Sequence, residues 1–241
     1  MEIVLKRSRL RGCENMEKRY ARNRNTISEE ENRQLKNSKV CVAGCGGIGG
    51  GLIESLVRIG VGHITAVDGD VFDETNLNRQ VLSNELNIGR PKALEAAAQM
   101  KEINSEAEIN PVYEFITEDN VNEIVRGHDV VADALDNITA RKLLEKACRE
   151  ENIPLVHGAI AGWNGQVSVI MPGDNLISSL YYDCEDRGEE TETGNPSFTP
   201  AVVSAIEAAE VIKILLKKQG ALKSSMLMID LLNHQYDVVE F

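Results

Sequence analysis

The amino-acid sequence predicts an α/β fold: a Rossmann-like, mostly parallel sheet with flanking helices and an antiparallel extension at the C-terminal end. Three observations lead to this prediction. Short apolar runs alternate with amphipathic segments along the chain, which indicates right-handed βαβ units. A glycine-rich turn joins the first apolar run to a long helical segment. The last two apolar runs, 225–230 and 235–241, are expected to pair as a hairpin at one edge of the sheet.

The first predicted elements are a capped helix and a βαβ unit. Ser28 and Glu31 have the S-x-x-E spacing of a capping box, which satisfies two orphan amide donors and predicts the start of a helix. The apolar run 39–43 ends in glycines and is a predicted buried strand. A helix is expected from about 47 to 59, and the next strand at 63–67.

The middle of the chain continues the alternation. A proline in the first turn favours a helix over 91–103. Residues 108–115 can form a strand, although Pro111 weakens that prediction. A helix near 118–125 and a strand at 129–132 are expected next.

The pattern is regular up to about residue 170 and is then lost. An amphipathic helix is predicted over 137–150, with strands at 154–158 and 166–170. From 172 to 200 no period is visible, and the segment 183–192 holds six acids and one arginine. We expect a mobile, solvated crossover loop there; the alternative is a docking strip for a basic partner surface.

A long helix is predicted over 201–216. Turn chemistry in Asn195–Pro200 stops the loop before it. The segment is apolar on one face, and Glu207, Glu210 and Lys213 lie on the other, which is the pattern of an amphipathic helix.

Composition indicates one soluble domain. Of the 241 residues, 42% are hydrophobic, which is too many for a disordered chain. The net charge of −12 makes nucleic acid a poor partner, although residues 1–24 hold eight basic and three acidic side chains and form a predicted basic N-terminal arm. The five cysteines have no C-x-x-C spacing, and no apolar run reaches about 18 residues. We therefore expect a cytoplasmic protein that does not contact a membrane.

The glycine-rich turn indicates a nucleotide site. Gly44, Gly46, Gly47 and Gly49 lie between a predicted strand and a predicted helix. Glycines there let a phosphate approach the backbone, and the helix N-terminus adds amide donors. Asp68 ends the next strand, where a carboxylate can bind ribose hydroxyls. The alternative is a tight turn whose glycines serve packing only.

Cationic side chains near this turn favour a triphosphate over NAD. Arg79 and Lys92 follow Asp68 closely, whereas a dinucleotide enzyme usually leaves the pyrophosphate to backbone amides. The two cations can neutralise a triphosphate and the charge that develops at the α-phosphorus. Asp136 and Asn137 lie just past the fourth predicted strand, and a carboxylate next to phosphate makes sense if it holds Mg²⁺.

Six motifs occur in a fixed order along the chain: Arg19-Tyr20-Ala21-Arg22, Gly44–Gly49, Asp68-Gly69-Asp70, Asn76-Leu77-Asn78-Arg79-Gln80, Gly89-Arg90-Pro91-Lys92 and Asp133–Asn137. Together they resemble the ThiF/MoeB/HesA family, the bacterial relatives of ubiquitin-activating enzymes. The resemblance runs from about Glu17 to Asp237. It implies a single adenylation domain over 1–241.

The activity that this resemblance implies is ATP-dependent adenylation. The enzyme would bind ATP and Mg²⁺ and adenylate the C-terminal glycine carboxylate of a small ubiquitin-like carrier, releasing pyrophosphate. The carrier would be a β-grasp protein that ends in Gly-Gly and serves a sulfur-carrier pathway.

The resemblance also implies a role for each matched residue. Arg22 would enter the site of a partner subunit, which implies a homodimer; the alternative is a basic, solvated helix face. Lys92 could instead be an ordinary surface lysine. Asp68 would bind the ribose, and Asp136 would organise Mg²⁺ and the α-phosphate. The phosphates would be contacted by Asn76, Arg79, Gln80 and Lys92. Asp70 and Asn137 complete the cofactor-binding set.

Two departures from the family pattern affect these expectations. Many members bind a structural zinc through two C-x-x-C pairs, which this sequence lacks, so we expect no zinc. Some members keep a reactive cysteine in the crossover loop. Cys184 is the only thiol near that place, and its acidic neighbours would weaken it as a nucleophile. Cys45, in the glycine turn, is expected to be a packing residue, and Cys41 and Cys148 are expected in the core.

Two alternatives to carrier adenylation stay open. The glycine turn with Asp68 also suits an NAD-dependent oxidoreductase, for which His157 is the only histidine near the carboxyl end of a strand. A zinc-free relative could activate another carboxylate, for example on a modified tRNA base, although the acidic net charge disfavours RNA.

Overall fold

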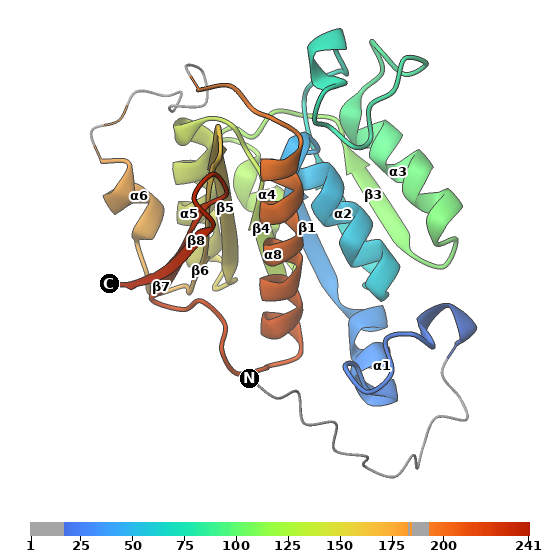
Figure 1. Ribbon diagram of the computed structural model, residues 1–241. Coiled ribbons are helices and arrows are strands. Elements are labelled where there is room, and N and C mark those ends of the chain that lie inside the picture. The colour runs from blue at the N-terminus through green and yellow to red at the C-terminus, as the bar shows by residue number, and fades with distance from the viewer. Residues whose placement is uncertain (1–16, 183, 185–192) are drawn as a thin grey trace.

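The computed structural model describes residues 17–182, 184 and 193–241. Its centre is one eight-stranded sheet in the order β3-β2-β1-β4-β5-β6-β7-β8 (Figure 1). Strands β3, β2, β1, β4 and β5 pair in parallel, and β5 to β8 pair antiparallel. The predicted fold class and C-terminal hairpin are confirmed. The strands are β1 (Lys39–Ala43), β2 (His63–Val67), β3 (Glu108–Val112), β4 (Val130–Asp133), β5 (Leu155–Ala161), β6 (Asn164–Ile170), β7 (Ser225–Asp230) and β8 (Gln235–Glu240).

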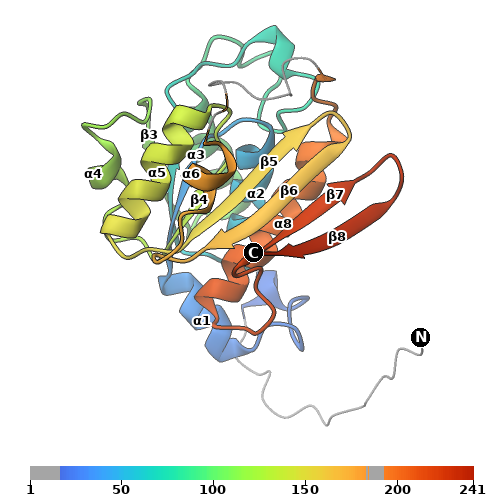
Figure 2. The ribbon, with the colours of Figure 1, turned by 90° about the vertical axis from the view of Figure 1, so that its left-hand side faces the viewer.

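Helices cover both faces of this sheet. Figure 2 shows α4, α5 and α6 on one face, with α2 and α8 on the other, where α3 also packs beside α2. The helices are α1 (Glu29–Asn37), α2 (Gly47–Ile59), α3 (Lys92–Ile103), α4 (Val121–Val125), α5 (Ile138–Glu150), α6 (Leu176–Leu180) and α8 (Phe198–Leu215), with 3-10 turns at Lys18–Tyr20 and Glu74–Asn76.

Each face of the sheet has its own hydrophobic core, because side chains alternate along a strand. In β1, Val40 and Val42 pack under α2 and α8, while Cys41 lies in the core beneath α4 and α5 together with Cys148. Burial raises the pKa of the Cys41 thiol to about 12. The prediction that Cys41 and Cys148 are core residues is confirmed.

The predicted capping box at the start of α1 is present. The Ser28 hydroxyl accepts from the Glu31 backbone N–H at 3.2 Å, and the Ser28 backbone N–H donates to the Glu31 carboxylate at 2.8 Å. This reciprocal pair fixes where α1 begins, and Leu35 from its other face is fully buried.

The prediction that Glu207 and Glu210 lie on a polar face of the last helix is wrong. Both side chains are buried, with exposed fractions of 0% and 2%. Helix α8 packs against α2 on one side and against β5 and β6 on the other, so two of its faces are covered. It also begins at Phe198 rather than at 201, because Pro200 fits within a first helical turn.

Other differences concern element ends. Strands β5 and β6 are each seven residues long, longer than predicted, because their antiparallel pairing continues through Ala161 and Asn164. Strand β3 ends at Val112 instead of 115. Helix α6 lies in a stretch expected to be a loop, and its five residues are too few to produce a visible period.

Several predictions fall on residues that the structure leaves undescribed. The basic arm is described only from Glu17 onward, and of the acidic segment 183–192 only Cys184 is described. Among the described residues, no helix has the length and apolar character needed to cross a bilayer.

Candidate active site

A cavity of about 820 Å³ opens at the carboxyl ends of the parallel strands. Its lining comes from the turns after β1, β2, β3 and β4, and from the end of β5. The strand order reverses between β1 and β4. In open α/β sheets this reversal leaves the crevice in which ligands bind.

The four predicted glycines divide into two structural roles. Gly44 has φ +98°, and a Cβ there would lie 2.4 Å from the carbonyl oxygen of Ala134; a Cβ on Gly49 would lie 1.8 Å from the Gly44 carbonyl oxygen. These two glycines are required by close backbone packing. Gly46 and Gly47 line the cavity, as Gly44 also does, but a Cβ on Gly46 would meet nothing closer than 3.5 Å.

The N-terminus of α2 opens onto the same cavity. Gly46 is its N-cap, and among the described residues no side chain makes a hydrogen bond that caps the helix. The first amides of this 13-residue helix therefore stay available for an acceptor, and the positive end of the helix dipole favours an anion there.

Asp68 lines the cavity and also braces the glycine turn. Its carboxylate accepts from the backbone N–H groups of Cys45 and Asp70, both at 2.8 Å. Burial raises the pKa of the Asp68 carboxyl, and the positive charge of Lys92 offsets part of that rise. Cys45 is fully buried beside it, as predicted for a packing residue, and burial raises the pKa of its thiol.

Lys92 is not an ordinary surface lysine. It begins α3, yet it is only 7% exposed, and its ammonium group lies 3.2 Å from an oxygen of Asp70. Both residues line the cavity. A buried ammonium needs an anionic partner, and here the exposed Asp70 supplies one that a phosphate could replace.

Arg79 and Gln80 also line the cavity, whereas Asn76 does not. The Arg79 guanidinium donates to the Thr75 carbonyl and to Asn78, and within the described residues it pairs with no carboxylate. Gln80 is 6% exposed, and its buried Oε1 has no hydrogen-bond partner there. The Asn76 side chain accepts from the Asp73 backbone N–H and caps the 3-10 turn.

The loop after β4 brings Asp136 and Asn137 to the cavity wall. Asp136 is exposed, and Asn137 caps α5 by accepting from the Ala140 N–H at 2.8 Å. The buried Asp133, the last residue of β4, accepts from the Leu135 N–H at 3.0 Å. Asp136 is thus the acid of this loop that faces the cavity.

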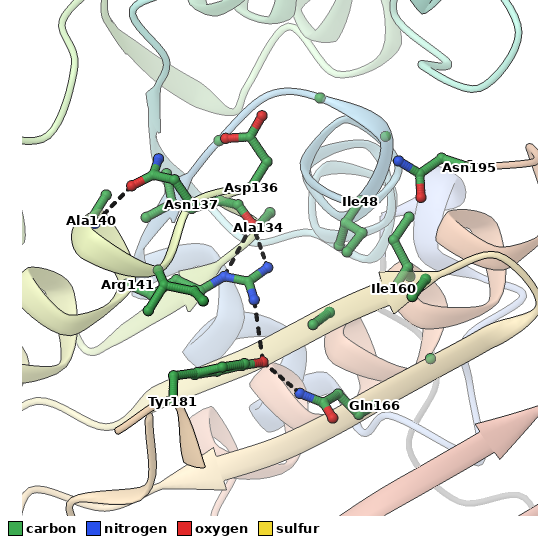
Figure 3. A pocket seen from close by; sticks show the side chains of 18 of the residues that line it. Ile48, Ala134, Asp136, Asn137, Ala140, Arg141, Ile160, Gln166, Tyr181 and Asn195 are labelled. Carbon is green, nitrogen blue, oxygen red and sulfur yellow. Dashed lines mark hydrogen bonds between the residues drawn. The ribbon is translucent and has the colours of Figure 1, made fainter. Parts of the chain in front are cut away.

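A buried polar network lies behind that loop (Figure 3). Arg141 of α5 donates through two nitrogens to the Leu135 carbonyl and through a third to the Tyr181 hydroxyl at 3.3 Å. The Tyr181 oxygen also accepts from Gln166 of β6 at 2.8 Å. Burial raises the pKa of the Tyr181 hydroxyl, which favours its protonated form.

His157 and Asp133 form the fully buried end of this network. Nδ1 of His157 lies 2.7 Å from Asp133, and its Nε2 lies 3.3 Å from the amide nitrogen of Gln166. Neither residue lines the cavity, but Gln166 does.

Arg141, Tyr181 and Gln166 were not among the residues predicted for the site. Arg141 is one of several charged residues of α5, so its charge alone does not distinguish it. Tyr181, which accepts from Arg141, and Gln166, which donates to Tyr181, are remote from it in sequence, so no local spacing reveals them.

The far half of the cavity extends over β5 to β8. Its lining residues are mostly uncharged, with two acids at the C-terminal hairpin: Ile160, Asn164, Gln166, Tyr181, Met228, Asp230, Gln235 and Asp237. Cys184 is exposed at its rim. The acidic neighbours on which its expected weakness depends lie outside the described residues.

Arg22, like Asn76, does not line the cavity. It is exposed in the turn that follows Lys18–Tyr20, before α1. Figure 1 shows α1 near the end of β1 that lies opposite to the start of α2. Arg22 cannot reach the cavity of its own chain from there.

Comparison with known proteins gives a consistent result. The model of the ThiF family matches residues 20–241. The SAMP-activating enzyme E1 of Haloferax volcanii is 36% identical over 228 residues, covering 92% of this chain and 84% of that enzyme. The molybdopterin-synthase adenylyltransferase of Salmonella typhimurium is 30% identical over 213 residues, covering 86% and 84%.

Longer relatives are matched only in part. The chain spans 44% of the adenylyltransferase and sulfurtransferase MOCS3 of Danio rerio, at 31% identity over 81% of this chain. Among solved structures, E. coli MccB with ATP has a TM-score of 0.73 at 23% identity, with 87% of this chain and 65% of that chain covered. This likeness establishes the fold.

Proposed function

The chain belongs to the ThiF family, and from that premise we propose that it uses ATP to adenylate the C-terminal carboxylate of a small ubiquitin-like carrier protein, releasing pyrophosphate. The relatives named as a SAMP-activating enzyme and a molybdopterin-synthase adenylyltransferase support this activity. We propose that the whole chain acts as one adenylation domain, which the match over 20–241 supports.

One observation carries the proposal: Arg79, Lys92 and Asp136 line a single cavity with Gly46 and Gly47. Arg79 and Lys92 belong to the connection from β2 to β3, Asp136 to the connection from β4 to β5, and the two glycines to the connection from β1 to β2. Two cations and one acid around an open helix N-terminus suit a triphosphate with its counter-ion.

The reaction needs little covalent help from the protein. A carboxylate oxygen of the carrier attacks the α-phosphorus of ATP, the bond from that phosphorus to the bridging oxygen breaks, and pyrophosphate leaves with the electron pair. Arg79 and Lys92 stabilise the charge that develops on the phosphate oxygens. Lys92 is held ready for this role because burial and Asp70 fix its position.

The residues present fit Mg²⁺ bound through the nucleotide. No group of three or more His, Cys, Asp or Glu side chains among the described residues could hold a metal alone. Mg²⁺ usually takes one or two carboxylates, and phosphate oxygens and water complete its shell. Asp136 would be that carboxylate, and the ion would neutralise phosphate charge. We propose no structural zinc.

The far half of the cavity suits an extended peptide tail. It continues from the loop of Asp136 to the C-terminal hairpin, and its mostly uncharged lining accepts a chain without large charged groups. We propose that a Gly-Gly tail lies there with its terminal carboxylate toward Asp136, and that the carrier is a β-grasp protein.

A second subunit completes the site in this proposal. Arg22 is exposed and remote from the cavity of its own chain. In a homodimer it would contribute its positive charge to the nucleotide bound by the partner.

His157 is not placed to act as the acid–base residue of an oxidoreductase. His157 is fully buried, its ring nitrogens contact Asp133 and Gln166, and it does not line the cavity.

ATP–pyrophosphate exchange with labelled pyrophosphate tests the function. We expect exchange that requires Mg²⁺ and a carrier ending in Gly-Gly, and none with a carrier that lacks those two glycines. Exchange that ignores the carrier, or that responds to tRNA instead, would contradict the proposal.

A further inference from the structure

The side-chain amide of Gln166, at the cavity wall, is held by partners from two other parts of the chain. Its amide nitrogen lies 2.8 Å from the Tyr181 hydroxyl oxygen and 3.3 Å from Nε2 of His157. Tyr181 is in turn held by Arg141 at 3.3 Å, with the guanidinium carbon 5.8 Å from the centre of its ring.

Asp133 determines which way the Gln166 amide points. An ionised carboxylate only accepts hydrogen bonds, so Nδ1 of His157, at 2.7 Å from Asp133, carries the proton. In a neutral ring Nε2 is then an acceptor, and it faces both the Gln166 amide nitrogen at 3.3 Å and the Tyr181 oxygen at 3.5 Å. The Gln166 atom facing these two groups is the NH₂ group, which donates to the Tyr181 oxygen.

This orientation leaves the carbonyl oxygen of Gln166 free for the cavity. Gln166 lines the cavity, and within the described residues no group donates to its Oε1. The same wall carries Arg141 and Tyr181, between the loop of Asp136 and the far half of the cavity (Figure 3). Oε1 is thus a fixed acceptor at the junction of the two halves.

A diglycine tail can meet such an acceptor with only one kind of group. Glycine has no side chain, so its polar groups are peptide C=O and N–H, and only the N–H can donate to Oε1. We infer that Gln166 binds a main-chain N–H of the carrier's terminal Gly-Gly, and that Tyr181 and His157 are positioning residues for it. This inference rests on the proposed function.

The first test replaces the acceptor. Gln166→Met keeps the length of the side chain but removes the amide, and Gln219→Met makes the same change at an exposed position outside the cavity. We expect Gln166→Met to raise the KM for carrier about fivefold to tenfold, the usual value of one hydrogen bond, with the KM for ATP unchanged. Gln219→Met should change neither. Equal carrier KM values for both variants would overturn the inference.

The second test removes the donor. Two semisynthetic carriers replace the N–H of the last or of the penultimate glycine by an ester oxygen. One of them should raise the carrier KM of the wild-type enzyme about as much as Gln166→Met does, and it should have no further effect on that variant. An ester effect of equal size in both enzymes would show that the N–H binds elsewhere.

A third variant tests the positioning role. Tyr181→Phe keeps the ring but removes the oxygen that fixes the amide, so we expect a smaller rise in carrier KM with normal ATP binding. A wild-type enzyme without exchange on the all-amide carrier would refute the proposed function itself. Exchange with unchanged KM in Gln166→Met and Tyr181→Phe would refute only the inference about Gln166.

Discussion

The carboxyl group of Glu207 lies directly over Gly158: a Cβ added to that glycine would be 2.6 Å from Cδ of Glu207. Helix α8 thereby brings a fully buried acid onto strand β5. Both carboxyl oxygens are buried and have no hydrogen-bond partner among the described residues. Burial, with the nearby charge of Asp133, raises the pKa of Glu207 well above its usual range.

The raised pKa predicts a specific pH dependence of stability. The folded state keeps the Glu207 proton, while the unfolded chain releases it above about pH 4.3. Stability is therefore fully present below that pH and falls as pH rises toward the folded-state pKa. We expect Glu207→Gln, which needs no proton, to be more stable than wild type at pH 8 by about 1–3 kcal/mol, with a smaller difference at pH 5.

Urea unfolding at the two pH values measures this difference. Glu210→Gln is the matched control, because the Glu210 carboxylate is buried but paired with Lys213 and with the Leu222 N–H at 2.9 Å. Glu210→Gln should be less stable than the wild type at pH 8. A stability gain of Glu207→Gln that does not depend on pH would contradict the explanation.

Gly158→Ala should destabilise the protein through Glu207. The added methyl group cannot fit against the carboxyl group, and overpacking of this kind costs about 1–3 kcal/mol. In a Glu207→Ala background the same change should cost much less. Thermal unfolding of the wild type, the two single variants and the double variant measures the coupling free energy between positions 158 and 207. Additive effects of the two substitutions would show that the contact is unimportant.

The two pairs of glycines should respond differently to alanine. Gly44→Ala meets a backbone carbonyl at 2.4 Å with a positive φ, so we expect a large loss of folded protein. Gly46→Ala meets only ordinary contacts and should keep its melting temperature, while the methyl group at the cavity wall raises the KM for ATP. Circular dichroism and exchange kinetics separate these outcomes. Destabilisation by Gly46→Ala comparable to Gly44→Ala would support a packing role for the whole turn.

Arg22 can be tested by mixing inactive subunits. If it acts in the partner's site, heterodimers of Arg22→Ala and Asp136→Asn contain one site with both defects and one intact site. A random equimolar mixture should then recover roughly a quarter of wild-type exchange activity. Each variant alone should be inactive. No recovery, although native mass spectrometry detects heterodimers, would exclude a role in trans.

Much of the fold was predictable because the relevant signals are local. Helix α2, strand β2 and the capping box of α1 depend on neighbouring residues and were located from the sequence. Glu207 was misplaced because its burial depends on Gly158, a residue of another element whose missing side chain leaves the space.

In the candidate site, too, some residues could be predicted from local sequence and others only from the tertiary fold. The glycine turn, Lys92 and Asp136 belong to recognisable motifs, and the cavity brings them together. The partners of Gln166 come from β5 and from the residue after α6, where Arg141 of α5 in turn holds Tyr181, and only the tertiary fold reveals that they meet.

By the proposed mechanism, the enzyme places an adenylyl group on a carrier carboxylate. Intact-mass analysis of a Gly-Gly carrier, after incubation with wild-type enzyme, ATP and Mg²⁺, measures this product directly. We expect a carrier species heavier by one AMP moiety that hydroxylamine removes, and none with Lys92→Met. An unmodified carrier in the presence of folded, ATP-binding enzyme would contradict the account.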